Sequence, residues 1–307
     1  MMTHRTGLGV AVCAAAGFLL LSAGGAEVLA VAEIPDAHSL YMPTDPEGGA
    51  GGDPYNPTGG GTQFLISGVP GYAWHHGCGP TAAGMVIGYH DTHGFGLLIP
   101  GDASTQTASV DQAIASTGHY NDYSLPKDSS PNLLPDLSEP PAGDEHASNC
   151  LADFMHTSFS SDNLYYGWSY YSYVDNALRD YTTWVNTTYG ASYIATSTND
   201  SSLTWAEFTT EMDANRPMVL LVDTDGDGDT DHFVTAIGYR DTQGFQEYGC
   251  LDTWAPASTV RWERFRYLGE GGWGIYGGTY YDITPEPATL ALLGLGALGF
   301  LLRRRRR

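Results

Sequence analysis

The sequence predicts an α+β fold, with helices in the N-terminal half and an antiparallel sheet in the C-terminal half. A Gly-Cys-Gly-Pro sequence at 77–80 precedes an apolar run at 82–89, which is typical of the start of a buried helix. Apolar positions recur every three or four residues near 174–189 and indicate a further helix. From Met218 onward, short β-favouring runs alternate with turns rich in Asp and Gly.

The first part of the chain contains two segments that we do not expect to belong to the folded domain. Residues 1–32 combine a basic start, an apolar run and an Ala-Val-Ala ending, which is typical of a secretory signal peptide. Residues 33–62 are rich in Gly and Pro and predict a linker, because they carry too few apolar side chains to form a core. We therefore expect an exported protein whose folded domain spans 63–283.

The C-terminal residues 285–307 have three parts in a fixed order. Pro-Glu-Pro comes first, an apolar segment at 288–302 follows, and five arginines end the chain. This order resembles the PEP-CTERM sorting signal of Gram-negative bacteria. An ordinary C-terminal membrane anchor is the alternative interpretation.

The PEP-CTERM resemblance carries several implications. It implies that an exosortase recognises and processes the tail. It implies a transmembrane helix at 288–302 that anchors the protein transiently to the inner membrane, with the arginines on the cytoplasmic side. The body of the protein is then expected at the cell surface or in the extracellular matrix.

The net charge restricts the class of partner. Lys and Arg total 13 against 35 Asp and Glu, which gives a formal charge of −22. Six of the basic residues lie in the terminal segments, at Arg5 and 303–307, so the body is strongly acidic. Such a field repels nucleic acid, and we expect no nucleic-acid partner. It is compatible with cation binding.

The helical part of the folded domain begins with a short extended lead-in at 64–66. The run at 82–89 is apolar on nearly every side, so its helix is expected to be surrounded by protein. Prolines interrupt the next segment, 100–143, and predict loops with one short helix at 110–116.

Two more helices precede the strands, at 174–189 and 202–212. The β-favouring runs 218–222 and 233–239 flank an Asp/Gly turn at 223–231, so they predict a hairpin. Further short strands are expected at 247–251, 260–265 and 276–283.

Cys78 is the candidate nucleophile. Proline two residues after it favours the first turn of a helix, so the thiol should stand at the helix N-terminus. The unpaired N–H groups and the partial positive charge of that terminus favour thiolate over thiol. The alternative is a cysteine that serves only as a small buried apolar residue.

A cysteine nucleophile needs a base and a group that orients the base. His232 opens the second strand of the predicted hairpin, where a strand holds its imidazole rigidly, and we assign it as the base. Asp252 ends a later strand and is expected to accept the second N–H of His232 through its carboxylate. The order Cys, His, Asp along the chain is the papain-like order.

Three motifs carry a family resemblance. Residues 77–85, 231–239 and 252–254 resemble cysteine peptidase family thirty-nine, the double-glycine leader peptidases, and especially its looser secreted relatives. The Asp-Thr-Trp of 252–254 is also similar to the Asn-Ser-Trp of papain. The resemblance implies a papain-like fold, with the nucleophile helix packed on the C-terminal sheet. It also implies thiol-dependent peptide hydrolysis through a thioester acyl-enzyme, with no cofactor required.

The chain departs from the papain-like pattern just before the nucleophile. Papain-like enzymes generally place a glutamine there as an oxyanion donor, whereas this chain offers His76, His75 and Trp74. The backbone N–H of Cys78 still serves as one donor, and loss of one good donor typically costs about 10²–10³ in rate. Two alternatives follow: a catalytically inactive papain-like binding module of the surface or matrix, and an acyl transferase or amide hydrolase with the same triad.

The acidic turn is a candidate metal site. Asp223, Asp225, Asp227 and Asp229 fit the first half of a calcium loop, but its twelfth position is Val234 instead of a bidentate Glu. A full EF-hand is therefore excluded. The turn either binds a structural calcium or is a solvated acidic turn.

The remaining cysteines, histidines and tyrosines leave further alternatives. Cys13 lies in the signal peptide, so Cys78, Cys150 and Cys250 form either one disulfide and one free thiol, or three free thiols. A disulfide, if formed, is expected to join Cys150 and Cys250. His75, His76, His90 and His93 lack the paired thiolate or carboxylate spacing of a metal site. The tyrosine-rich segment 164–173 is interpreted as packing in preference to a substrate wall.

Overall fold

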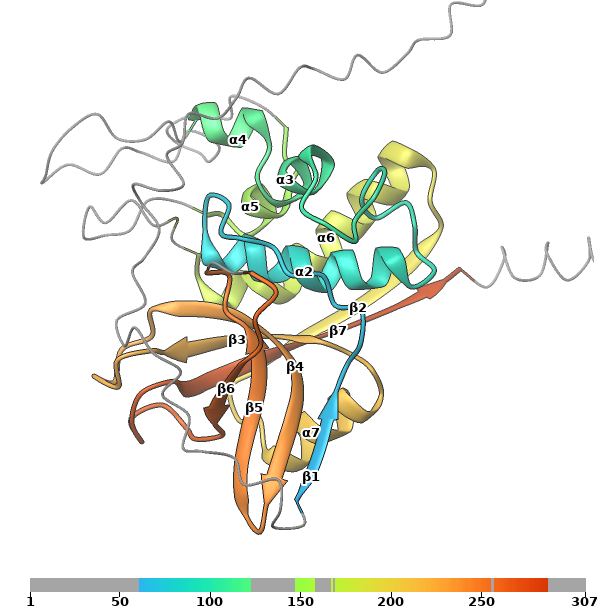
Figure 1. Cartoon of the computed structure of the whole chain (residues 1–307). Helices are drawn as coiled ribbons and strands as arrows, with labels where there is room; N and C mark the ends of the chain where they lie inside the picture. The colour runs from blue at the N-terminus through green and yellow to red at the C-terminus, as the bar shows by residue number, and fades with distance from the viewer. Residues whose placement is uncertain (1–60, 123–146, 158–166, 168, 255–256, 287–307) are drawn as a thin grey trace, which may run out of the picture. The chain divides into compact units, whose positions relative to one another are not determined.

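The computed structural model describes residues 61–122, 147–157, 167, 169–254 and 257–286. All of them belong to one compact unit, 33–307. Figure 1 shows a layer of helices over one face of an antiparallel sheet, with a single further helix near the strands β1 and β4. The predicted α+β class is confirmed.

The sheet has seven strands, and every named pair is antiparallel. Their order is β2-β7-β3-β4-β5-β6, and β1 pairs with β4 beyond the end of β3. The predicted 218–239 hairpin is present as β3 and β4. The strands are β1 Thr62–Leu65, β2 Tyr193–Asp200, β3 Met218–Asp223, β4 His232–Thr242, β5 Phe245–Leu251, β6 Arg261–Arg264 and β7 Gly274–Pro285.

The helices of the described residues are α2 Cys78–Thr92, α3 Ala108–Ile114, α4 Thr117–Asp122, α5 Leu151–Phe154, α6 Tyr171–Tyr189 and α7 Trp205–Asp213. Every residue of α2 from Cys78 to Asp91 is buried, which explains why its sequence is apolar on nearly every side. Helix α7 starts at a capping box in which Thr204 accepts from the Glu207 backbone N–H and Glu207 accepts from Thr204.

The sheet separates two hydrophobic clusters because successive side chains of a strand point to opposite faces. Val219 and Leu221 of β3 pack in the cluster that contains α2 and α6. Leu220 and Val222 of the same strand pack in the cluster that contains α7. The helices therefore cover both faces of β3 and β4.

This separation corrects the expectation for the cysteines. Cys150 belongs to the cluster on the α2 side and Cys250 to the cluster on the α7 side, so the sheet lies between them. Cys78, Cys150 and Cys250 are all free thiols. The predicted Cys150–Cys250 disulfide is wrong, and the alternative with three free thiols is confirmed.

Helix α2 is fixed directly to strand β4. The Thr235 hydroxyl donates a 2.9 Å hydrogen bond to the backbone carbonyl of Ala82, and both residues are fully buried. Because β4 begins at His232 and α2 begins at Cys78, this contact sets the two elements of the candidate site against each other.

The expectation of a transmembrane helix is corrected. In the part of the chain that the structure describes, no helix is both long and apolar enough to cross a membrane. The apolar run 288–302 lies outside that part, and its 15 residues are fewer than the roughly 20 that a spanning helix needs. The expected signal peptide at 1–32, nearly all of the linker and the arginine tail also lie outside the described residues.

Candidate active site

Cys78 is the first residue of α2, as predicted. The preceding Gly77 adopts φ 151° and ψ 140°, no side chain caps the helix start, and the first turn contains no acidic residue. The first N–H groups of a helix have no acceptor within the helix, so those of Cys78 and Gly79 remain available to a ligand. Cys78 itself is 9% exposed, at the boundary between core and surface.

His232 contacts Cys78 from the first position of β4. Its imidazole is almost completely buried and forms a side-chain hydrogen bond with the Cys78 thiol. Burial lowers the pKa of His232, but the charge and hydrogen bond of Cys78 together with the contacts to Asp252 outweigh it, so the pKa is raised above 6.5. The imidazolium form is therefore retained above that pH.

The atom that orients His232 is a backbone oxygen. His232 Nε2 lies 2.7 Å from the carbonyl oxygen of Asp252. A carbonyl only accepts, so Nε2 carries the proton in this contact. Nδ1 is then the nitrogen that faces the Cys78 thiol, as a general base requires.

The carboxylate of Asp252 is bound elsewhere. Its Oδ1 accepts from the backbone N–H of Trp254 at 3.0 Å, and its Oδ2 accepts from Arg261 Nε at 2.9 Å. The expected contact of the Asp252 carboxylate with His232 is therefore replaced by a contact of its backbone carbonyl, and the catalytic role of Asp252 stays a prediction. The sequence did not identify Arg261, because β6 gives no short-range signal that links it to the site.

Two tryptophans enclose the imidazole. The ring of Trp254 stacks on His232 with centroids 4.4 Å apart and planes at 18°, and Trp273 meets the same ring edge-on at 6.4 Å. Both indoles are buried. Trp254 was part of the motif quoted at 252–254, whereas Trp273 immediately precedes β7 and had no sequence signal. The rings exclude water from the hydrogen bond to the Asp252 carbonyl.

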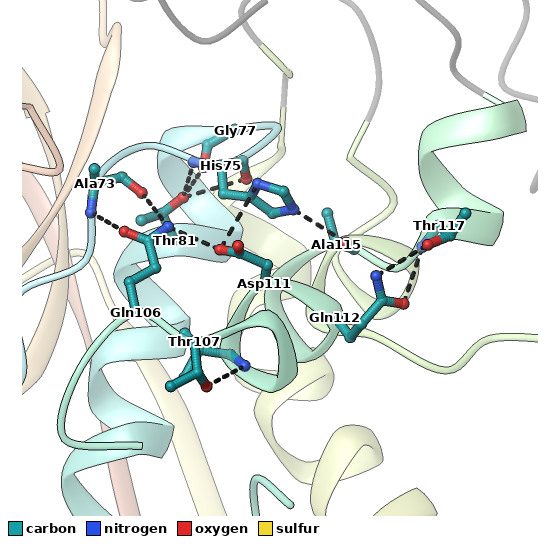
Figure 2. A network of polar contacts seen from close by, with 11 residues as sticks. Ala73, His75, Gly77, Thr81, Gln106, Thr107, Asp111, Gln112, Ala115 and Thr117 are labelled. Carbon is teal, nitrogen blue, oxygen red and sulfur yellow. Dashed lines mark hydrogen bonds and ion pairs between the residues drawn. The ribbon is translucent and has the colours of Figure 1, made fainter. Parts of the chain in front are cut away.

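The loop before the nucleophile is fixed by the network in Figure 2, and His75 within it is buried. The His75 N–H donates to the Thr81 hydroxyl at 2.9 Å, and that hydroxyl donates to the Gly77 carbonyl at 2.7 Å. The His75 ring has Nε2 3.2 Å from the Ala115 carbonyl and Nδ1 3.9 Å from the carboxylate of Asp111 in α3. His75 is therefore the weakest of the three oxyanion candidates.

A glutamine does take part in this network, and its side chain bonds to Ala73 and Asp111 (Figure 2). Gln106 accepts from the Ala73 N–H at 2.7 Å and donates to the Ala73 carbonyl at 3.1 Å. Its amide also donates to Asp111 at 2.8 Å. These bonds hold the loop in place and leave the amide of Gln106 with a structural role.

The other two oxyanion candidates lie next to the site. The backbone N–H of Trp74, not its indole, donates to the Thr253 carbonyl at 2.7 Å, and this bond joins the loop before Cys78 to the loop after Asp252. His76 adopts φ 58°, a left-handed conformation that is uncommon outside glycine. Its ring meets His119 edge-on with centroids 5.0 Å apart. The role of either side chain as a donor stays a prediction.

A second Cys-His-Asp group lies near this loop. His119, Cys150 and Asp153 are buried, and one potential ligand atom of each lies within 4.8 Å of the others. The Asp153 carboxylate accepts from His119 Nδ1 at 2.6 Å and from the backbone N–H groups of Asn149 and Cys150 at 2.8 and 3.2 Å. Burial, followed by the charge of Asp153, raises the pKa of Cys150 well above its ordinary value. A thiol held protonated and bound to a carboxylate is a poor nucleophile and a poor metal ligand.

The acidic turn between β3 and β4 brings three carboxylates together. Asp223, Asp225 and Asp227 each have an oxygen within 4.8 Å of the others, whereas Asp229 donates its N–H to Asp227 at 2.8 Å and is not in this group. Asp223 accepts from the N–H groups of Gly226 and Gly228 at 2.7 and 2.8 Å. The turn is therefore ordered by its own hydrogen bonds, and calcium binding stays a prediction.

Comparison with protein-family models identifies the chain. Residues 66–278 match the model of the Peptidase_C39 like family. The chain belongs to this family. As a member of the family it has the papain-like α+β arrangement, with the Cys78 helix against an antiparallel sheet, so the predicted fold and resemblance are confirmed. No curated protein matches the chain.

A second family model covers the C-terminus. The PEP-CTERM protein-sorting motif matches residues 284–307. This motif indicates recognition by an exosortase-type sorting system and an exported protein that is processed at the membrane of Gram-negative bacteria. The chain is thus an exported protein of the cysteine peptidase-like C39 type, while its placement at the cell surface or in the matrix stays a prediction.

Proposed function

We propose that this family member is an exported cysteine peptidase that hydrolyses peptide bonds with Cys78 as the nucleophile. The observation that carries the proposal is the contact of the Cys78 thiol with a buried His232 whose other nitrogen is held at 2.7 Å by a backbone carbonyl. This gives nucleophile, base and orienting group in hydrogen-bonded sequence, which is the arrangement that thiol hydrolases use.

The mechanism follows from these contacts. His232 Nδ1 takes the proton of Cys78, and the thiolate sulfur attacks the carbonyl carbon of the peptide bond. The oxyanion forms beside the first backbone N–H groups of α2, with His76 or Trp74 as the proposed second donor. The imidazolium returns its proton to the leaving amine, and a thioester remains. His232 then deprotonates water, which attacks the thioester and releases the carboxylic acid and the free thiol.

The proposal is tested by alkylation of the mature protein with iodoacetamide and iodoacetate across pH, with Cys150→Ala as the matched control. We expect Cys78 to react at pH 6 at least tenfold faster than an ordinary thiol, and His232→Ala to remove this advantage. With iodoacetate, attraction of the anionic reagent to the imidazolium gives a profile that falls at high pH. Because the pKa of His232 is raised, this alkaline limb lies above pH 6.5.

Two results would contradict the proposal. The first is a Cys78 that reacts like an ordinary thiol in both the intact protein and the His232→Ala variant. The second is alkylation that the Cys150→Ala substitution abolishes, since that result would place the reactive thiol at the buried Cys-His-Asp group around Asp153.

A binding module without peptidase activity is the second candidate function. It is favoured by the Gln106 amide, whose hydrogen bonds to Ala73 and Asp111 commit it to the loop. A reactive Cys78 with no cleavage of a denatured protein substrate would support this candidate. Formation of new amide bonds with an added amine, at the expense of hydrolysis, would instead support an acyl transferase.

A further inference from the structure

The guanidinium of Arg261 contacts Asp252, the residue that orients His232 in the candidate site. Arg261, on β6, donates from Nε to Asp252 at 2.9 Å and from Nη1 to Glu263 at 3.4 Å. Its side chain is only 12% exposed. The guanidinium lies over the ring of Trp273 at 4.4 Å and 5.6 Å from the ring centre of Trp254. Arg261 therefore contacts the carboxylate of Asp252 and both tryptophans that enclose His232.

We propose that Arg261 is a positioning residue of the catalytic site, which holds the Asp252 carboxylate so that the Asp252 backbone carbonyl meets the imidazole of His232. The inference rests on the proposed function of Cys78 and His232. Its geometric basis is that Asp252 uses different atoms for the two contacts: the carboxylate for Arg261 and the carbonyl for His232. The Asp252 carboxylate is thus held by two donors, Arg261 Nε and the Trp254 backbone N–H, while the second arginine bond to Glu263 fixes the direction of the guanidinium.

Arg261 also balances charge beside the imidazole. The titratable or charged groups around His232 and its orienting residue are Cys78 of α2, Asp252, Cys250 of β5, Arg261 and Glu263 of β6, and the preceding Asp231. The carboxylate of Asp231 accepts from the backbone N–H and the hydroxyl of Thr224, at 3.0 and 2.6 Å. Without Arg261 the carboxylate of Asp252 would be unbalanced and would stabilise the imidazolium. Without the carboxylate, Arg261 would destabilise it.

The two substitutions therefore have opposite signs. For Arg261→Met we expect the alkaline limb of the iodoacetate profile to rise by about one pH unit, and for Asp252→Asn to fall by about one unit. The alkaline limb of the double variant Asp252→Asn/Arg261→Met should lie between those of the two single variants, because both of these charges are removed while the carboxylate of Glu263 remains.

A conservative variant separates charge from positioning. Arg261→Lys keeps the positive charge but cannot contact both carboxylates through a planar fork. We expect its alkaline limb to stay in place while the rate of Cys78 alkylation on the plateau falls about 10-fold or more. Asp252→Asn leaves the arginine on the tryptophans, so it carries the test if Arg261→Met does not fold.

The outcomes are distinguishable. If the unsubstituted protein shows an activated Cys78 but Arg261→Met and Asp252→Asn both leave the alkaline limb unmoved, or shift it in the same direction, the role of Arg261 is refuted and the peptidase proposal stands. If Cys78 of the unsubstituted protein is not activated, both proposals are refuted. Opposite shifts of the single variants, with the double variant between them, support the inference.

Discussion

The stability of the β4–β5 hairpin should depend on a buried ion pair near its turn, at the end away from the candidate site. Arg240 and Glu247 face each other across the strands, and the guanidinium contacts the carboxylate through two bonds of 2.5 and 2.6 Å. Their side chains are 10% and 1% exposed. At the other end of the same hairpin lie His232 and Asp252, so the register that Arg240 and Glu247 fix is also the register of the site.

Glu247→Gln keeps the shape of this side chain and removes its charge. Breaking one side of a buried ion pair costs about 3–5 kcal/mol, because the remaining charge stays buried. Arg240 keeps its position 4.7 Å from the ring centre of Trp262, which retains part of its stabilisation. We therefore expect a loss near the lower end, about 3 kcal/mol, or roughly 6–12 °C in Tm for a domain of this size.

The chain supplies a matched control for this prediction. Arg216 and Glu211 form the same two-bond contact at 2.6 and 2.7 Å, but their side chains are 32% and 14% exposed. Glu211→Gln should cost about 1 kcal/mol or less, because water can solvate the charge of Arg216 that remains. Urea denaturation of the two variants measures the difference. Equal losses would show that burial does not decide the strength of the Glu247 pair and would refute the reasoning.

Two further predictions concern the loops on either side of the site. Gly167 adopts φ 57°, and a Cβ there would overlap the carbonyl oxygen of His76, so Gly167→Ala should lower the alkylation rate of Cys78 more than tenfold. An unchanged rate would show that this contact does not hold the loop. For the turn at 223–231, millimolar calcium should raise Tm, and Asp225→Asn should abolish the rise. Identical melting with calcium and with chelator would end the calcium prediction.

Local sequence signals were sufficient for the parts of the site that local chemistry determines. The helix start at Cys78 follows from a proline and an apolar run that adjoin it, and the strand start at His232 from a turn rich in Asp and Gly. Strand β2 was missed because Tyr193–Asp200 is mostly polar and has one buried residue, so it lacks the alternation that identifies a half-buried strand.

Long-range contacts were not accessible in the same way. Which atom of Asp252 meets His232 depends on where β6 places Arg261, and no spacing rule connects these residues. The disulfide prediction failed for a related reason. Cys150 and Cys250 lie in the hydrophobic clusters on opposite faces of the sheet, and the sequence does not show this. Even a correct assignment of Cys250 to a strand does not say which face of the sheet it occupies.

The backbone supplies several of the interactions that family motifs usually assign to side chains. The Asp252 carbonyl orients His232, and the Trp74 N–H joins the nucleophile loop to the Thr253 carbonyl. The first N–H groups of α2 are available to an oxyanion in the same way. An Asp in place of the papain Asn therefore does not by itself argue against activity, because its carboxylate is not the orienting group. The missing glutamine is a different matter, because its donor is a side-chain N–H, and the reactivity of Cys78 toward a peptide bond tests His76 and Trp74 as its replacement.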